Sequence, residues 1–346
     1  MTDAVTQSGP LPSRKAGWSG SWLGPLPRYV LRRLSQAILV ILLVVIGSFL
    51  LLKMAPGDLV DVLSGFSDMT ADQMAALRVR YGLDQPVYIQ LFRYVKTLAT
   101  LDFGFSPLNN APVLDVILGR WPVTAILVVS SVIISMLVGT VLGVIAARNA
   151  GRPLDLAIST LMLLFYATPS FVIAIIFILV FGVFMSLMPI SGFSTAGANL
   201  TGLDYVWDVI KHLTMPIMAL CTFYIAIYVR ICRAAMLEVL KLDYIRTARA
   251  KGLSEERVVY VHALRNAMLP LVTMAGLQVS ALVGGAVLVE TIFGLPGMGR
   301  TAFDAVFERD TNLLLGVLFI SSLSVVVVNF LIDMLYMILD PRVELT

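Results

Sequence analysis

The sequence predicts an all-α polytopic membrane protein with six transmembrane helices. Of its 346 residues, 58% are hydrophobic and only 14% are charged, and the mean hydropathy is +0.90. A soluble domain cannot bury this much apolar surface, so part of the surface has to face lipid. Apolar stretches of ~20 residues alternate with charged segments, and this is the length that a bilayer of ~30 Å requires of a helix. The chain is therefore predicted to form one multi-span membrane domain.

The first predicted transmembrane helix, residues 28–56, follows a tail, residues 1–27, that we expect to be flexible and cytoplasmic. Three arginines precede an apolar run from Leu34 to Leu52. This run is too long for a signal peptide and no small-residue cleavage site follows it. We therefore expect an uncleaved span.

Residues 57–120 are predicted to form an ordered helical segment outside the membrane, on the extracytoplasmic side. They mix Asp, Arg and Tyr with apolar residues. The sequence from Gly82 to Pro86 indicates a turn between two short helices.

Residues 121–346 are predicted to form a core with the other five spans. The second span is expected to begin at Pro122, because a proline suits the first turn of a helix, and to end near Ala147. Its Gly139 and Gly143 form a GxxxG pair, which indicates a close helix crossing.

The third apolar stretch, Leu154 to Met188, is too long for one straight span. It is interrupted at Thr168-Pro169-Ser170, where we expect a kink or a break. The last three spans are predicted at about His212 to Ile231, Leu269 to Glu290 and Leu313 to Leu339.

The positions of the basic residues predict the orientation of these spans. With both termini and the loop 233–270 in the cytoplasm, most of the 25 Lys and Arg residues lie on the cytoplasmic side. Positive side chains stay preferentially on that side, so the charge distribution agrees with six spans.

The cytoplasmic loop 233–270 is the most informative segment. From Ile231 to Gly252, apolar residues recur at helical spacing and basic residues cover the rest, which predicts an amphipathic helix continuing from the fourth span. Gly252 is a helix stop and Ser254 an N-cap, so a second short helix is expected. Such a pair suits a groove on a soluble partner, with basic residues for orientation and apolar residues for contact. It suits a surface of anionic lipid equally well.

Motifs of soluble enzymes are absent from the sequence. There is no GxxxxGK[ST], HExxH or GxSxG motif, and the two histidines, His212 and His262, fall on opposite sides of the membrane. We therefore expect no catalytic residue, no metal site and no ATP hydrolysis by this chain. Nothing in the composition indicates nucleic-acid binding. An ion-coupled secondary transporter or channel is the main alternative, but the predicted membrane interior holds essentially Asp333 alone as a carboxylate.

A resemblance to a known family distinguishes the two readings of the loop. Its runs DYIRTARAKGLS, residues 243–254, and HALRNAMLP, residues 262–270, resemble the EAA loop of inner-membrane permeases of binding-protein-dependent ABC importers. Within these, the chain resembles the B-type subunit of the dipeptide, oligopeptide and nickel branch. Further matching runs share the same order along the chain: APGD at 55–58, YGLDQP at 81–86, DFG at 102–104, TPSF at 168–171, ETIFGLPGMG at 290–299 and DPR at 340–342.

Two departures from the family pattern are present. The general EAA consensus begins with Glu, whereas this chain has Arg246 and Thr247 before Ala248. The N-terminal tail is also longer than is usual for these permeases.

The resemblance implies a type I ABC importer permease fold, also called MetI-like, in a bacterial inner membrane. The implied partners are a second homologous permease subunit, two cytoplasmic ATPase subunits that bind ATP and Mg, an extracytoplasmic binding protein and membrane lipid. This chain itself is implied to bind no cofactor. It would receive the motion of the ATPases through a coupling helix around Gly252. The transported solutes would be peptides, nickel chelates, opines or other small solutes, which would cross the membrane between the permease subunits. The implied coupling residues are Tyr244, Arg246, Thr247, Ala248, Ala250, Lys251, Gly252, Leu253 and Ser254.

Two further groups of residues are predicted to have roles. The polar or kinking residues Pro169, Gln278, Ser280 and Asn329 are candidates for the pore or for helix packing. The loop residues Gly294, Pro296, Gly297 and Gly299 suit either a tight structural turn or contact with the binding protein.

Overall fold

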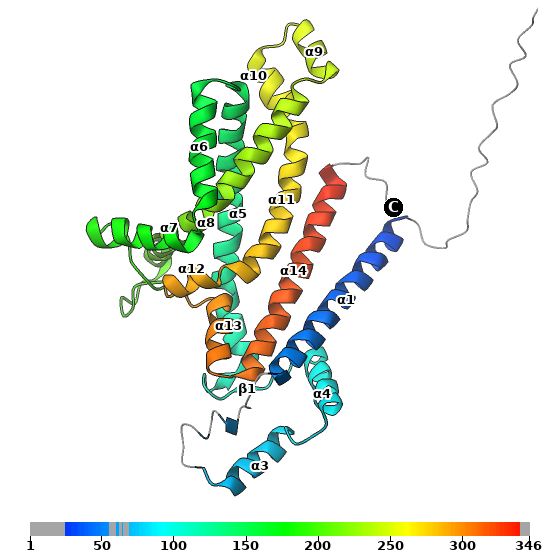
Figure 1. The fold of residues 1–346 in the computed structure, drawn as a ribbon, viewed down its shortest axis with the longest axis vertical. Coiled ribbons are helices and arrows are strands. Elements are labelled where there is room, and N and C mark those ends of the chain that lie inside the picture. The colour runs from blue at the N-terminus through cyan, green and yellow to red at the C-terminus, as the bar shows by residue number, and fades with distance from the viewer. Residues whose placement is uncertain (1–24, 55–59, 62–63, 65–68, 340–346) are drawn as a thin grey trace, which may run out of the picture.

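The computed structural model describes residues 25–54, 60–61, 64 and 69–339. Figure 1 shows an elongated bundle of helices with α9 and α10 at one end and α3, α4 and β1 at the other. We name these the α9 end and the α3 end. The first helix, α1 (Pro25–Met54), starts on the side nearer the α9 end and runs toward the α3 end, and the last, α14 (Thr311–Leu339), runs back in the opposite direction (Figure 1). The predicted tail up to residue 24 and the runs at 55–58 and 340–342 lie outside the described residues.

Four helical segments of the described part are long and apolar enough to cross a membrane: 113–148, 202–239, 255–279 and 311–332. Two further helical segments, 153–167 and 170–184, are apolar enough only when taken together, and they are bent by 98° at the break between them, as in a broken span or a re-entrant loop. In α1 the apolar helical run Leu34–Leu50 is shorter. These helices confirm a polytopic α-helical membrane protein, while the count of six spans stays a prediction.

The second span begins earlier than predicted. Helix α5 runs from Val113 to Arg148 and passes through Pro122, which does not start it. The physical reason is burial: Val113 and Ile117 are fully buried in a cluster that includes Leu313 of α14. Such packing stabilises two extra turns and overrides the local preference of proline for a helix start.

Helix α8 (Gly202–Val239) packs along α5 at the two predicted glycines. A Cβ added at Gly143 would lie 2.5 Å from the Cβ of Cys232, and one added at Gly139 would overlap Tyr228. Only glycine lets the two backbones approach this closely, so the predicted close crossing is confirmed.

The break at Thr168-Pro169-Ser170 is confirmed. Helix α6 (Pro153–Ala167) ends before Thr168, whose backbone is extended, and Pro169 precedes α7 (Ser170–Phe177). A residue before proline is disfavoured in the helical region, which explains why the helix stops here. A π-helical stretch, η1 (Ile178–Phe184), continues α7.

The predicted amphipathic helix from Ile231 to Gly252 is wrong as one continuous element. Helix α8 ends at Val239, and a separate helix, α9 (Asp243–Ala250), follows. The predicted helix start after Ser254 is confirmed, because α10 (Glu255–Arg257) begins there. Its predicted shortness is wrong, since η2 (Val258–Ala263) and α11 (Leu264–Gly285) follow directly, with Pro270 inside α11. The break before α9 turns Ile245 and Ala248 inward, where they join a buried cluster with Val258 and Val259.

The α3 end confirms the predicted helix–turn–helix. Helices α3 (Ala71–Tyr81) and α4 (Val87–Ala99) are joined at Gly82, which has a φ of +67°. Thr70 and Gln73 form a capping box at the start of α3. A two-stranded antiparallel hairpin, β1 (Phe105–Ser106) and β2 (Ala111–Pro112), precedes α5, and α12 (Val287–Ile292) and α13 (Met298–Phe307) lie between α11 and α14.

Candidate functional site

The segment 243–254, which we call the knuckle, projects from the α9 end of the bundle (Figure 1). Its apolar face is used internally, since Ile245 is fully buried and Ala248 is 8% exposed. The face that remains open to a partner is mostly polar. Its members are the exposed residues Asp243, Tyr244, Arg246, Thr247, Arg249, Ala250, Lys251, Gly252 and Ser254, beside a half-buried Leu253.

This burial corrects one part of the expected partner surface. Ala248 was expected in the contact, but it packs against the protein's own core. Apolar contact from the knuckle is thus left to Ala250, Leu253 and the exposed ring of Tyr244, while Arg246 and Lys251 supply positive charge.

Two sets of interactions hold the knuckle to the helix that follows it. Arg249 donates to both carboxylate oxygens of Glu255, at 2.7 and 3.1 Å, which raises the pKa of Arg249 above its usual value. The hydroxyl of Tyr244 accepts from Asn266 at 2.6 Å and donates to the carbonyl of His262 at 3.4 Å. The knuckle is therefore tied to α10, η2 and α11 and can transmit a push as one body.

Gly252 lies in the turn that the Arg249–Glu255 pair spans. Its φ is +75°, in the left-handed region that side chains other than glycine rarely adopt. Apart from its chain neighbours, no atom of the described residues lies within 4 Å of where a Cβ would stand. The backbone conformation, and not a lack of space, is what requires glycine here.

An ion pair that the sequence pattern gave no sign of anchors α8 beneath the knuckle. Arg233 donates from Nε and Nη2 to the carboxylate of Asp155 in α6, at 2.7 and 2.8 Å. The amide of Gly151 also donates to Asp155, at 3.0 Å. The side chain of Asp155 is 6% exposed and that of Arg233 is 33% exposed. This bidentate pair fixes α6 to α8 where α8 approaches the knuckle.

The four candidate pore residues lie in different environments. Pro169 is exposed at the break between α6 and α7, and Ser280 lies on α11. Gln278 is 3% exposed, and within the described part of the chain neither polar atom of its amide has a hydrogen-bond partner. Asn329 lines an apolar groove of about 710 Å³ between α14 and α1. A pore role for these residues stays a prediction.

The glycine-rich loop 294–299 surrounds a buried carboxylate. Glu290 is fully buried and accepts from the hydroxyl of Thr124 at 2.6 Å and from the amide of Arg300 at 2.9 Å. A Cβ at Gly297 would overlap the Glu290 carboxylate, and one at Gly299 would lie 2.9 Å from the Cα of Val287. The structure therefore gives these two glycines a packing role. Contact with a binding protein stays a prediction for the half-buried Gly294 and Pro296.

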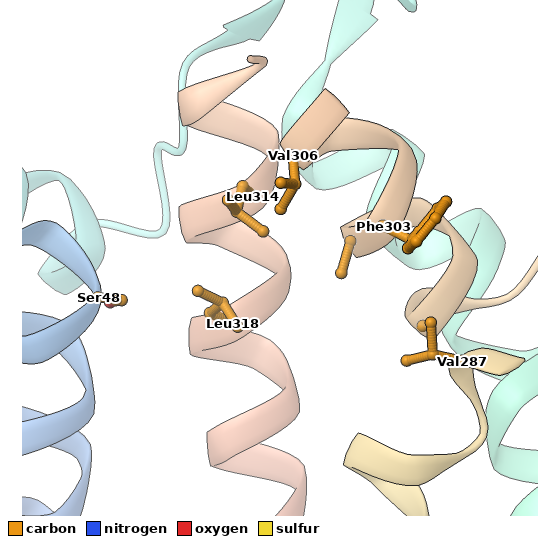
Figure 2. Close-up of a pocket in the computed structure, with 8 residues that line it drawn as sticks. Ser48, Val287, Phe303, Val306, Leu314 and Leu318 are labelled. Carbon is orange, nitrogen blue, oxygen red and sulfur yellow. The ribbon is translucent and has the colours of Figure 1, made fainter. Parts of the chain in front are cut away.

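Gly299 also borders an apolar hollow of about 410 Å³ between α1, α13 and α14. Figure 2 shows Leu314 and Leu318 of α14 facing it, with Ser48 on α1 opposite and Phe303 on α13. Its lining is almost wholly apolar. It suits hydrocarbon or a neighbouring apolar helix better than a polar solute.

Two family patterns match consecutive parts of the chain. Residues 139–345 match the family described as "Binding-protein-dependent transport system inner membrane component". Residues 26–128 match the family described as its N-terminal part, "Binding-prot-dependent transport system membrane comp, N-term".

Curated relatives resemble the chain over nearly its full length. The chain is 36% identical over 317 residues to the "Oligopeptide transport system permease protein AppB" of Bacillus subtilis, covering 91% of this chain and 99% of the relative. It is 37% identical over 334 residues to the "Dipeptide transport system permease protein DppB" of Escherichia coli K12, covering 92% and 98%.

The fold is shared with a solved transporter. A chain of the "MetNI methionine ABC transporter", in inward-facing conformations, superposes with a TM-score of 0.53 at 17% identity, covering 65% of this chain and 96% of that chain. The predicted MetI-like fold is therefore confirmed. Together with the family matches, which span both the first helix and the knuckle, this shows that the chain belongs to the family of inner-membrane components of binding-protein-dependent transport systems.

Proposed function

We propose that this chain is a channel-forming subunit of an ATP-driven importer for peptides or related small solutes. The observation that carries the proposal is the knuckle, a clamped, basic projection at one end of a membrane bundle. A rigid projection of this kind suits docking in a groove of a soluble ATPase, which would bind the ATP and Mg that this chain has no motif to bind. Peptides are proposed as substrates because the curated relatives are named for oligopeptide and dipeptide transport.

The α9 end is proposed to face the cytoplasm of a bacterial cell, and the α3 end the opposite side. The start of α1 and the end of α14 lie on the side nearer the α9 end (Figure 1), so both termini would be cytoplasmic. The α3 end would receive the solute-binding protein. The bundle would be completed by a second, homologous permease subunit and by two ATPase subunits.

The proposal is tested by replacing Gly252 with tryptophan in the complete transporter. A tryptophan at φ +75° strains the turn and covers the docking face, so we expect uptake to fall at least tenfold. Gly151→Trp is the matched control, because Gly151 has a φ of +78° and equally open surroundings in the loop before α6. Co-purification of the ATPase subunits and uptake are measured for both variants. Unchanged uptake with normal ATPase association in Gly252→Trp would exclude the coupling role.

The substrate is tested separately. The solute-binding protein that co-purifies with this subunit is screened against di- and oligopeptides, nickel chelates, opines and sugars. Binding of peptides in preference to the other classes supports the proposal, and binding of another class alone would replace peptides as the substrate.

A further inference from the structure

A groove of about 340 Å³ lies between α6 and α8 and holds an arginine that the coupling role leaves unused. Met162, Ala226 and Val229 form its buried apolar floor. Arg233 at its rim is held by Asp155. Arg230 is exposed, and within the described part of the chain no carboxylate forms an ion pair with it.

The guanidinium of Arg230 lies over the ring of Tyr166, 5.3 Å from its centroid. Tyr166 is itself stacked on Phe223 of α8, with ring centroids 5.2 Å apart and an interplanar angle of 15°. The two aromatic rings thus hold the arginine in one place while leaving its N–H groups available. This is a prearranged cation with aromatic neighbours.

The position of Arg230 in the membrane follows from its partner. Tyr166 lies eleven residues after Asp155 on α6, and a helix rises 1.5 Å per residue, so the Cα of Tyr166 lies ~16 Å further along α6 than that of Asp155, away from the α9 end. The side chain of Arg230 therefore points away from the α9 end, toward the interior of the bilayer. To bind a lipid headgroup at the membrane surface near the α9 end, the side chain of Arg230 would have to point toward that end. A charge at this depth is costly in hydrocarbon and marks a water-filled path or a ligand.

We propose that Arg230, positioned by Tyr166, binds the carboxylate of a peptide as it passes through the assembled transporter. The inference rests on the proposed peptide-import function and adds a site within the path. Carboxylate is the anion that every unmodified peptide carries, and an arginine fork with free N–H groups binds it with two hydrogen bonds. The apolar floor of the groove suits the adjacent side chain of the peptide.

The test compares trialanine with trialanine amide, which lacks the terminal carboxylate. The complete transporter and its binding protein are reconstituted in phosphatidylcholine vesicles, and both peptides are supplied at concentrations that saturate the binding protein. We expect Arg230→Gln to lower uptake of trialanine about tenfold and to leave uptake of the amide nearly unchanged, because a hydrogen bond to a charged group is lost only for the acid. Arg230→Lys should keep part of the preference for the acid.

Lys211→Gln is the control, since Lys211 is a cation over an aromatic ring, Trp207 at 5.7 Å, on the same helix but outside the groove. Lys211→Gln should keep the wild-type ratio of trialanine uptake to trialanine amide uptake. If Arg230→Gln does not assemble, Tyr166→Leu is used, which should lower the same ratio by releasing the guanidinium.

Three results would overturn the site, and one of them also overturns the proposed function. An acid-to-amide ratio that Arg230→Gln leaves unchanged excludes carboxylate binding. An equal loss for both peptides that occurs only when phosphatidylglycerol is added assigns the groove to anionic lipid. No uptake of either peptide by the wild-type transporter, with the binding protein occupied, excludes peptide import itself and the site with it.

Discussion

Arg249 and Glu255 form a two-armed ion pair across the turn at Gly252, with N–O distances of 2.7 and 3.1 Å. Both side chains are about half exposed, so the pair contributes little to global stability, ~0–1 kcal/mol. Its two parallel hydrogen bonds nevertheless fix the angle between α9 and α10. The pair therefore acts on the direction of the knuckle more than on the stability of the bundle.

Breaking this pair is predicted to uncouple transport from ATP hydrolysis. Arg249→Gln or Glu255→Gln should lower uptake severalfold in reconstituted transporter while the melting temperature stays nearly constant, because only the knuckle loses its fixed direction. The charge reversal Arg249→Glu with Glu255→Arg should recover part of the uptake. As a control, Asp243→Asn breaks the neighbouring pair with Arg246, which is 3.3 Å long and far more exposed, and should have little effect. If uptake by the charge-reversed double variant is no higher than uptake by either single variant, the ion pair does not fix the direction of the knuckle.

Adding one methyl group at Gly143, where α5 crosses α8, is predicted to destabilise the protein. In Gly143→Ala the new Cβ would meet the Cβ of Cys232 at 2.5 Å and the carbonyl of Val229 at 3.1 Å, so the helices must separate at a cost of about 1–3 kcal/mol. Gly119→Ala is the matched control on the same helix, because outside the helix's own backbone no atom of the described residues lies within 4 Å of the added Cβ. It should be neutral or stabilise by about 0.5–1 kcal/mol. Thermal unfolding in detergent measures both, and equal melting temperatures would exclude close packing at Gly143.

The features predicted correctly from the sequence are those that one local signal defines. Pro169 disfavours helix at Thr168, the glycine spacing marks the α5–α8 crossing, and Gly252 follows a helix end as predicted. The predicted start of α5 was wrong because burial of Val113 and Ile117 extends the helix through Pro122 regardless of local preference. The predicted bounds of α8 were also wrong, but its first turns, residues 202–207, are exposed, so burial does not explain them.

The interactions that no sequence pattern indicated join distant positions. Arg233 and Asp155 are 78 residues apart, and Thr124 and Glu290 are 166 apart. From the sequence alone, Asp155 and Glu290 each look like an ordinary acidic residue of a helix near a membrane surface. Only the packing of α6 on α8, and of α12 on α5, brings each one to its donor.

The Asp155–Arg233 pair is predicted to stabilise the α9 end of the bundle. Asp155→Asn leaves the half-buried Arg233 without a charged partner, so the melting temperature should fall more than in Asp243→Asn, which breaks an exposed pair. Arg233→Gln in the Asp155→Asn background should restore part of the loss, because no uncompensated charge then remains. A melting temperature in Asp155→Asn equal to that of Asp243→Asn would show that the pair is dispensable.

The hydroxyl of Thr124 is predicted to hold the start of α13 in place. It donates to Glu290 at 2.6 Å and accepts from the amide of Met298 at 2.8 Å, so one hydroxyl connects α5, α12 and α13. Thr124→Val keeps the shape but leaves a buried carboxylate oxygen and a buried amide without this partner, at a cost of roughly 1–3 kcal/mol for each unsatisfied group. Thr124→Ser keeps the hydroxyl and should lose much less stability. Thr124→Val keeps the methyl and loses the hydroxyl, whereas Thr124→Ser keeps the hydroxyl and loses the methyl. A melting temperature for Thr124→Val as high as that for Thr124→Ser would therefore mean that the methyl contact contributes at least as much as the hydrogen bonds, and it would contradict the role given to the hydroxyl.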